Sequence, residues 1–171
     1  ISGDSELLKN LEWFKNRAKE QNNLEAPIIR KPFFCSGCPH NSSLKVPEGK
    51  RALGGIGCHY MAVDSIESTE FFTQMGGEGT PWIGIAPFSH ERHVFANLGD
   101  GTYKHSVILA IRASLDANVN ITYKILYNDA VAMTGGQEIG SNWDVEGIVK
   151  QVLAEGVKKV SILSEDPKRY N

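Results

Sequence analysis

Residues 93–126 read HVFANLGDGTYKHSVILAIRASLDANVNITYKIL and change periodicity twice. His93–Leu98 and Ile121–Leu126 are short and mostly apolar, a pattern typical of buried strands. Between them, Lys104–Ala117 carries apolar residues at the spacing of one helix face. Strand, helix and strand in this order predict two parallel strands joined by a crossover helix.

The same alternation extends to both sides of this unit. Arg51–Gly57 predicts a short buried strand that runs into a glycine-rich turn, and His59 to about Ser65 predicts a helix. A last helix, from about Val145 to Glu155, precedes a predicted strand at Lys159–Leu163. Alternating strands and helices predict an α/β fold, a parallel sheet with helices on both faces.

The N-terminal region follows a different pattern. Asp4–Gln21 places its apolar residues on one helix face, with Asp4 or Ser5 available as the N-cap, and this predicts an amphipathic helix. We therefore expect an N-terminal helix and linker over residues 1–30 and the main domain over residues 31–171. Because the chain starts at Ile1 and not at Met, we expect it to be a fragment of a longer multidomain chain.

Composition excludes several classes of protein. With 171 residues, 41% hydrophobic and 22% charged, the chain has the make-up of an ordinary globular domain. Eighteen Lys and Arg residues against twenty Asp and Glu residues give a net charge of −2, which argues against a nucleic-acid partner. No segment approaches the roughly 18 consecutive apolar residues of a membrane span, so we expect no membrane contact and a cytoplasmic location.

A candidate ligand site follows the first predicted strand of the 93–126 unit. Gly99-Asp100-Gly101-Thr102 stands where ligands bind in open parallel sheets, just beyond the carboxyl end of a strand. Asn128 follows the next strand, so Asp100 and Asn128 are expected at the same sheet edge. Two hard oxygen ligands suit Mg²⁺, and a helix N-terminus with flexible glycines suits a diphosphate. The alternative for Gly-Asp-Gly taken alone is a simple turn.

The three cysteines form a second candidate site. Cys35-Ser36-Gly37-Cys38 lies in a loop rich in proline and glycine, and Cys58 follows after nineteen residues. An odd number of cysteines argues against a closed disulfide framework. A Cys-x-x-Cys loop directs two thiolates to one centre, which suits zinc and an iron–sulfur cluster equally well.

Five motifs in one order resemble the 2-oxoacid:ferredoxin oxidoreductases, and most closely the thiamine-diphosphate-binding region of the indolepyruvate ferredoxin oxidoreductases. The likeness covers roughly residues 30 to 170. The motifs are CSGCPH from Cys35, GIGCHY from Gly55, MGGEG from Met75, GDGT from Gly99 and YNDAVAMTGG from Tyr127. The resemblance implies a thiamine-diphosphate-binding fold of the pyrophosphate type.

The resemblance also implies which residues hold the cofactor. Asp100, Asn128 and the carbonyl of Ala130 would hold Mg²⁺. The remaining residues implied to contact thiamine diphosphate lie in the GDGT turn and in the loop after Asn128: Gly99, Gly101, Thr102, Val131, Ala132, Met133 and Thr134. Gly57, Cys58 and His59 resemble residues that line the cofactor, and His40 is a further candidate.

For the cysteines, the resemblance implies a [4Fe-4S] cluster. Cys35, Cys38 and Cys58 would be three of its four ligands, and no fourth cysteine is present in this chain. The implied reaction is the oxidative decarboxylation of a 2-oxoacid, such as indolepyruvate or another arylpyruvate, to an acyl-CoA, with electrons passing to ferredoxin.

Several partners follow from the same resemblance. These are the 2-oxoacid substrate, coenzyme A, ferredoxin and the domain or subunit that binds the aminopyrimidine ring of the cofactor. We also expect a homo-oligomer. The family's activating glutamate has no match in this chain, so we expect the chain alone to be inactive.

Two alternatives stay open at this point. One is a non-oxidative thiamine-diphosphate-dependent decarboxylase component whose cysteine site holds zinc or nothing. The other is a non-enzymatic module in which Cys35, Cys38, Cys58 and His40 form a structural zinc knuckle. An iron–sulfur cluster in the complete protein would argue against both, and binding of thiamine diphosphate separates the decarboxylase component from the zinc-knuckle module.

Overall fold

The computed structural model describes residues 5–22, 31–66, 68–140 and 144–170. The chain divides into two compact units, residues 1–31 and 32–171. In the first unit, α1 (Ser5–Asn22) is a helix without a buried residue, and its leucines and Phe14 are exposed. The structure confirms the predicted N-terminal helix, whereas the proposed capping residue Asp4 lies outside the described residues.

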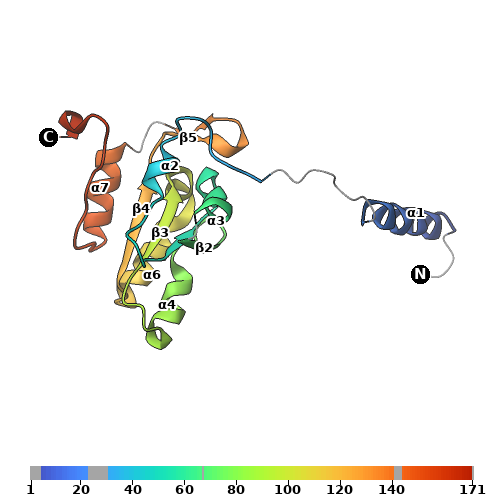
Figure 1. The fold of residues 1–171 in the computed structure, drawn as a ribbon, viewed down its shortest axis with the longest axis horizontal. Coiled ribbons are helices and arrows are strands. Elements are labelled where there is room, and N and C mark those ends of the chain that lie inside the picture. The colour runs from blue at the N-terminus through green and yellow to red at the C-terminus, as the bar shows by residue number, and fades with distance from the viewer. Residues whose placement is uncertain (1–4, 23–30, 67, 141–143, 171) are drawn as a thin grey trace. The chain divides into compact units, whose positions relative to one another are not determined.

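The second unit is built on a sheet of four parallel strands (Figure 1). The strands are β1 (Ala52–Gly54), β2 (Thr69–Phe72), β3 (Val94–Gly99) and β4 (Ile121–Leu126). They lie side by side in the order β2-β1-β3-β4. Pairing between β3 and β4 runs from Val94 opposite Ile121 to Gly99 opposite Leu126, so both strands end at the same sheet edge. The predicted parallel α/β sheet is confirmed.

Short helical segments connect and cover the strands. The α-helices of this unit are α2 (His40–Ser43), α3 (Ala62–Ser65), α4 (Thr80–Ile85), α5 (Asp100–Thr102), α6 (Ile108–Asp116) and α7 (Val145–Ala154). The 3₁₀-helices are η1 (Cys58–Met61), η2 (Ala86–Phe88), η4 (Ala132–Thr134) and η5 (Pro167–Tyr170). The segment η3 (Tyr103–Val107) is a π-helix. Among the described residues, no helix is both long and apolar enough to cross a membrane.

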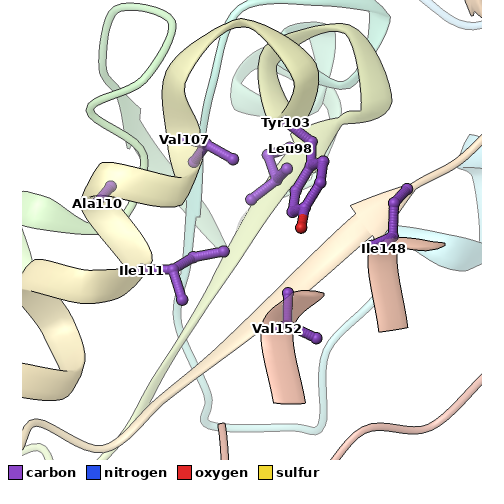
Figure 2. Close-up of a cluster of buried hydrophobic side chains, with 7 residues drawn as sticks. All are labelled: Leu98, Tyr103, Val107, Ala110, Ile111, Ile148 and Val152. Atoms are coloured by element: carbon purple, nitrogen blue, oxygen red, sulfur yellow. The ribbon is translucent and has the colours of Figure 1, made fainter. Parts of the chain in front are cut away.

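The main hydrophobic core joins β3 to the helices α6 and α7. Leu98 of β3 packs with side chains from the helical segment that follows it and with two residues of α7 (Figure 2). The members are Leu98, Tyr103, Val107, Ala110, Ile111, Ile148 and Val152. Asp144 caps the N-terminus of α7, because its side chain accepts a hydrogen bond from the Gly147 amide at 2.7 Å. This core fixes the helix that begins at the end of β3.

A smaller core lies on the opposite face of the sheet. Phe34, Leu44 and Ala62 are buried together, and Leu126 packs against them. Its neighbour Ile125 packs against the main core instead. Because successive strand side chains point to opposite faces, these two residues show that β4 is covered on both sides. The prediction of helices on both faces is confirmed.

The helix after β3 differs from a regular α-helix. It begins at Asp100, earlier than the predicted Lys104, and its second segment, Tyr103–Val107, is a π-helix. Regular α-helix follows from Ile108. Short π-segments inside helices occur frequently at functional sites.

One predicted element is wrong, and several observed elements were not predicted. Lys159–Leu163 is irregular, although its sequence is rich in β-branched residues. Val160 contacts the main core, but Leu163 is 94% exposed, so the segment lacks both a paired backbone and a buried face. The unpredicted elements include β2, α2, α4 and a hairpin of β5 (Ala130–Val131) and β6 (Gln137–Glu138).

Candidate cofactor site

Asp100 joins the ends of β3 and β4. Its Oδ2 atom accepts hydrogen bonds from the backbone amides of Asn128 at 2.9 Å and Asp129 at 2.6 Å. Its Oδ1 atom accepts one from the Gly101 amide at 2.9 Å. The structure therefore brings the predicted Asp100 and Asn128 together at one sheet edge, as the parallel register requires.

Burial and hydrogen bonding act on Asp100 in opposite directions. The residue is 5% exposed, and this burial raises the pKa of its carboxyl group above the ordinary value. The amides of Asn128, Asp129 and Gly101 oppose the shift, because their hydrogen bonds favour the charged carboxylate. A cation at the carboxylate would act in the same direction as these amides.

The turn after β4 places the other two predicted magnesium ligands beside Asp100. The Asn128 Oδ1 atom accepts a hydrogen bond from the Ala130 amide at 3.3 Å. Asp129, between them, has a left-handed backbone with φ of 56°. This conformation is uncommon for residues other than glycine and is tolerated best by Asn and Asp, so the residue type suits the turn.

The predicted loop after Asn128 is a hairpin that contacts the GDGT turn. A Cβ built on Gly101 would lie 3.4 Å from Cγ2 of Val131, so the hairpin packs directly over Gly101. Val131, Ala132, Met133 and Thr134 are all exposed. The Thr134 hydroxyl donates to Oε1 of Gln137 at 2.8 Å, which closes the hairpin. Apolar side chains of Val131 and Met133 are thus presented to solvent next to the GDGT turn.

His59 lies close to Gly99, the last residue of β3, at the same sheet edge. A Cβ on Gly57 would be 2.6 Å from its Cε1 atom, and a Cβ on Gly99 would be 3.8 Å from that atom. His59 is 2% exposed, and burial, with a contribution from His40, lowers its pKa to about 4. It is therefore neutral at pH 7.

His40 belongs to the same group of rings. The His40 and His59 rings stack with centroids 6.5 Å apart. His40 Nδ1 and His59 Nε2 are buried, and within the described residues neither atom has a hydrogen-bond partner. Burial lowers the pKa of His40 as well. Two buried imidazoles with unused nitrogen atoms, of which His59 lies close to Gly99, are the kind of lining that a polar ligand would satisfy.

The three cysteines belong to two segments, and one of them, Cys58, is the chain neighbour of His59. Cys35 and Cys38 lie in one turn, closed by a hydrogen bond from the Cys38 amide to the Cys35 carbonyl at 3.0 Å. Burial raises the pKa of the Cys58 thiol, and Cys38 and Cys35 raise it further, so the three thiols lie within electrostatic range. All three are free. Across the described part of the chain, no group of three or more His, Cys, Asp or Glu residues is arranged to hold a metal ion.

The residues at the sheet edge fit magnesium and a diphosphate. Asp100, Asn128 and the Ala130 carbonyl offer only oxygen atoms, the donor type that Mg²⁺ prefers. Gly101 leaves no side chain between the turn and Val131, where a Cβ would reach van der Waals contact. The site therefore has oxygen donors that suit the ion and a glycine backbone, without a side chain of its own, that suits a diphosphate.

Sequence reasoning missed three residues that build this site. Glu78 is fully buried and accepts a hydrogen bond from the Thr102 hydroxyl at 2.9 Å. The Asp129 amide binds Asp100, and both amide atoms of the Asn97 side chain are buried without a partner among the described residues. The sequence signal for Glu78 is the MGGEG motif, which contains it between two glycines.

Comparisons with known proteins agree with this geometry. Residues 55–160 match the family model described as thiamine pyrophosphate enzyme, C-terminal TPP binding domain. The indolepyruvate oxidoreductase subunit IorA of Thermococcus kodakarensis is 26% identical over 150 residues, which cover 76% of this chain and 23% of that protein. The subunit of the same name from Pyrococcus abyssi is 26% identical over an alignment of 174 positions, gaps included. This alignment covers 88% of this chain and 26% of that protein.

The chain thus spans about a quarter of the length of these curated relatives. No solved structure matches it. The family match extends over more than half of the chain and includes the ends of β3 and β4, with Asp100 and Asn128. The chain belongs to the thiamine pyrophosphate enzyme family, whose C-terminal TPP binding domain it carries.

Proposed function

We propose that this chain is the part of a thiamine-diphosphate-dependent 2-oxoacid oxidoreductase that binds the diphosphate and Mg²⁺. The observation that carries the proposal is the Asp100 carboxyl group, which ties the end of β3 to the Asn128 turn after β4. The family match to a TPP binding domain over residues 55–160 supports it.

The substrate class rests on the relatives. Both are named indolepyruvate oxidoreductase subunits, and we extend this substrate to the complete protein that contains this chain. The proposed overall reaction converts indolepyruvate or another arylpyruvate, with coenzyme A, to the acyl-CoA and CO₂. It releases one proton and two electrons, and the electrons pass singly to two ferredoxins.

Each part of the site has a proposed task. Asp100, Asn128 and the Ala130 carbonyl would hold Mg²⁺, and the backbone around Gly99, Gly101 and Thr102 would receive the diphosphate. Thiamine diphosphate, when bound, supplies the nucleophilic carbon that attacks the 2-oxo carbonyl and the electron sink that lets CO₂ leave. The chain's own contribution would be to bind Mg²⁺ and the diphosphate and so to orient the cofactor.

The hairpin and the histidines would complete the lining. Val131, Ala132, Met133 and Thr134 would lie along the cofactor, where the apolar members exclude water. His59, neutral because its pKa is about 4, can offer an uncharged nitrogen beside Gly99 and Gly57. His40 stacks on His59 and would hold that ring in place.

We further propose that Cys35, Cys38 and Cys58 bind a [4Fe-4S] cluster that takes electrons from the cofactor site. The turn that joins Cys35 to Cys38 and the influence of both thiols on the pKa of Cys58 support this assignment. A fourth ligand would come from outside this chain. The remaining partners of the proposal are an aminopyrimidine-binding domain or subunit and a second copy of the same enzyme.

Metal analysis of the full-length protein, purified without oxygen, tests the oxidoreductase proposal. We expect iron and acid-labile sulfide in equal amounts, about four of each for every cluster. Zinc without sulfide, or no metal at the cysteines, would contradict the ferredoxin-linked reaction and favour the non-oxidative decarboxylase. Zinc together with a failure to bind thiamine diphosphate would favour the zinc-knuckle module.

Cysteine variants assign the metal to this chain. Cys35→Ser, Cys38→Ser and Cys58→Ser should each lower the iron and sulfide content by about one cluster per protein. Ser36→Ala, within the same turn, is the matched control and should keep the full content. Equal iron in Cys58→Ser and in the unchanged protein would exclude Cys58 as a ligand.

A further inference from the structure

Glu78 is a buried carboxyl group that the proposed function leaves without a task. It is fully buried, and both of its oxygen atoms accept hydrogen bonds. Oε2 accepts from the Gly76 amide at 2.7 Å, and Oε1 accepts from the Thr102 hydroxyl at 2.9 Å. Burying a carboxyl group costs free energy, and these two hydrogen bonds offset part of that cost.

Thr102 is tied to this carboxyl group from the other side. Its Oγ1 atom donates to Glu78 and also accepts a hydrogen bond from the Gly76 amide at 3.2 Å. The hydroxyl is therefore used twice within the protein, and Thr102 is 2% exposed. Thr102 is the last residue of the GDGT turn, so the network ends at the predicted diphosphate site.

The surrounding glycines show that the Glu78 loop fits closely. A Cβ on Gly55 would lie 2.4 Å from Oε1 of Glu78, and a Cβ on Gly76 would lie 2.1 Å from the Ser106 hydroxyl. Ser106 belongs to the π-helical segment that follows Thr102. The loop over residues 75–79 therefore packs against both the end of β1 and the start of the helix that carries the GDGT turn.

We infer that Glu78 is a positioning residue for the diphosphate of the cofactor. It holds the Thr102 hydroxyl, and through Thr102 it fixes the backbone of Gly101 and Thr102 in the orientation that receives the diphosphate. Thr102 then serves the cofactor through its backbone, because its hydroxyl is committed to Glu78 and Gly76. This inference rests on the proposed function, and it assigns a residue that does not itself touch the cofactor.

Binding measurements on the full-length protein test the inference. Two ligands are used, thiamine diphosphate and inorganic pyrophosphate, each with Mg²⁺, and binding is measured by calorimetry. In Glu78→Gln, the side chain keeps its size but has one acceptor oxygen fewer, so either the Gly76 amide or the Thr102 hydroxyl proton loses its acceptor at residue 78. We expect Kd to rise about tenfold for both ligands. This is the lower end of the range of about 10- to 100-fold that is typical when a residue that orients a binding group is changed.

Thr102 supplies two further variants and an internal rescue. Thr102→Val keeps the shape but removes the hydroxyl, and it should raise Kd about as much as Glu78→Gln does. Thr102→Ser restores the hydroxyl and should bring Kd back to within about twofold of the unchanged protein. In the double variant Glu78→Gln/Thr102→Val the two effects should not add, because both break one network. Glu48→Gln, an exposed glutamate, is the matched control.

The outcomes separate this inference from the proposed function. If the unchanged protein binds neither ligand, the proposed function itself is wrong. If the unchanged protein binds, but Glu78→Gln and Thr102→Val lower only the melting temperature and leave Kd unchanged, Glu78 is merely structural and the inference is overturned. Should Glu78→Gln not fold, Thr102→Val and its serine rescue decide the question, because both leave Glu78 in place.

Discussion

The Asp100 Oδ2 atom, at the end of β3, lies 2.9 Å from the backbone nitrogen of Asn128, just beyond β4. One carboxyl group thereby orders the turn that presents Asn128 and Ala130, in addition to being a predicted Mg²⁺ ligand. Loss of the carboxylate should therefore disturb the turn and the ion together.

Asp100→Asn should weaken the binding of thiamine diphosphate with Mg²⁺ by about 10- to 100-fold. This corresponds to about 1.5–3 kcal/mol, the usual contribution of hydrogen bonds to a charged group. The amide cannot accept at both positions, and one of the backbone donors loses its acceptor. Calorimetric titration measures the change. Asp116→Asn, an exposed residue of α6, should bind like the unchanged protein, and equal Kd values for both variants would refute the assignment.

Gly79→Ala, just before α4, should destabilise the domain, whereas Gly84→Ala within α4 should not. Gly79 has φ of 82°, and an added Cβ would lie 2.6 Å from the hydroxyl oxygen of Tyr123. We expect a loss of about 1–3 kcal/mol from strain and overpacking. Gly84 has open space around its Cβ position, so alanine there should stabilise by up to about 1 kcal/mol. Thermal melting compares the two, and a lower melting temperature for Gly84→Ala than for Gly79→Ala would contradict the packing.

Ile111→Ala should lower the free energy of unfolding by about 2–5 kcal/mol. Ile111 is 3% exposed and belongs to the core between β3, α6 and α7 shown in Figure 2. Leu109→Ala, two positions earlier and 61% exposed, is the matched control and should change stability by less than about 0.5 kcal/mol. Denaturant unfolding measures both. Equal losses would mean that α6 presents a different face to the sheet.

Tyr103 should make the protein less stable at high pH. Burial, with a smaller contribution from the charge of Glu155, raises the pKa of Tyr103 to about 12. The folded chain therefore holds the phenol proton more tightly than the unfolded chain, and stability falls as pH rises from about 10 to about 12. The loss should be about 2–3 kcal/mol larger in the unchanged protein than in Tyr103→Phe.

Tyr103→Phe also removes the hydrogen bond that the Tyr103 hydroxyl donates to Gln151 at 2.8 Å. The variant should therefore start from a lower stability at pH 8 and show a flatter decline above pH 10. Unfolding free energies measured at several pH values in this range give both quantities. If the unfolding free energies of the two proteins declined in parallel above pH 10, the pKa of Tyr103 would not be raised by folding.

The strongly patterned elements could be predicted from local sequence. The predicted strand Ile121–Leu126 has the bounds observed for β4, and the predicted helix from about Val145 to Glu155 is α7 within one residue. These segments carry their own apolar periodicity, so their secondary structure follows from neighbours in the chain.

Elements that depend on distant partners could not be predicted in this way. Thr69–Phe72 is a strand because β1 pairs with it, and Lys159–Leu163 is not one because it pairs with no strand in the described part of the chain. Strand propensity reports how a side chain suits a pleated surface, not whether a partner strand is present.

The sequence alone determined the α/β class, the positions of Asp100 and Asn128 at strand ends, and the likeness to thiamine diphosphate enzymes, because these follow from periodicity and from motif spacing. The tertiary structure alone decided that Asp100 binds the Asn128 amide and that Glu78 holds Thr102, residues 24 positions apart. Such contacts arise only when the parallel strands bring separate loops to one sheet edge, and no local pattern in the chain encodes which side chains then meet.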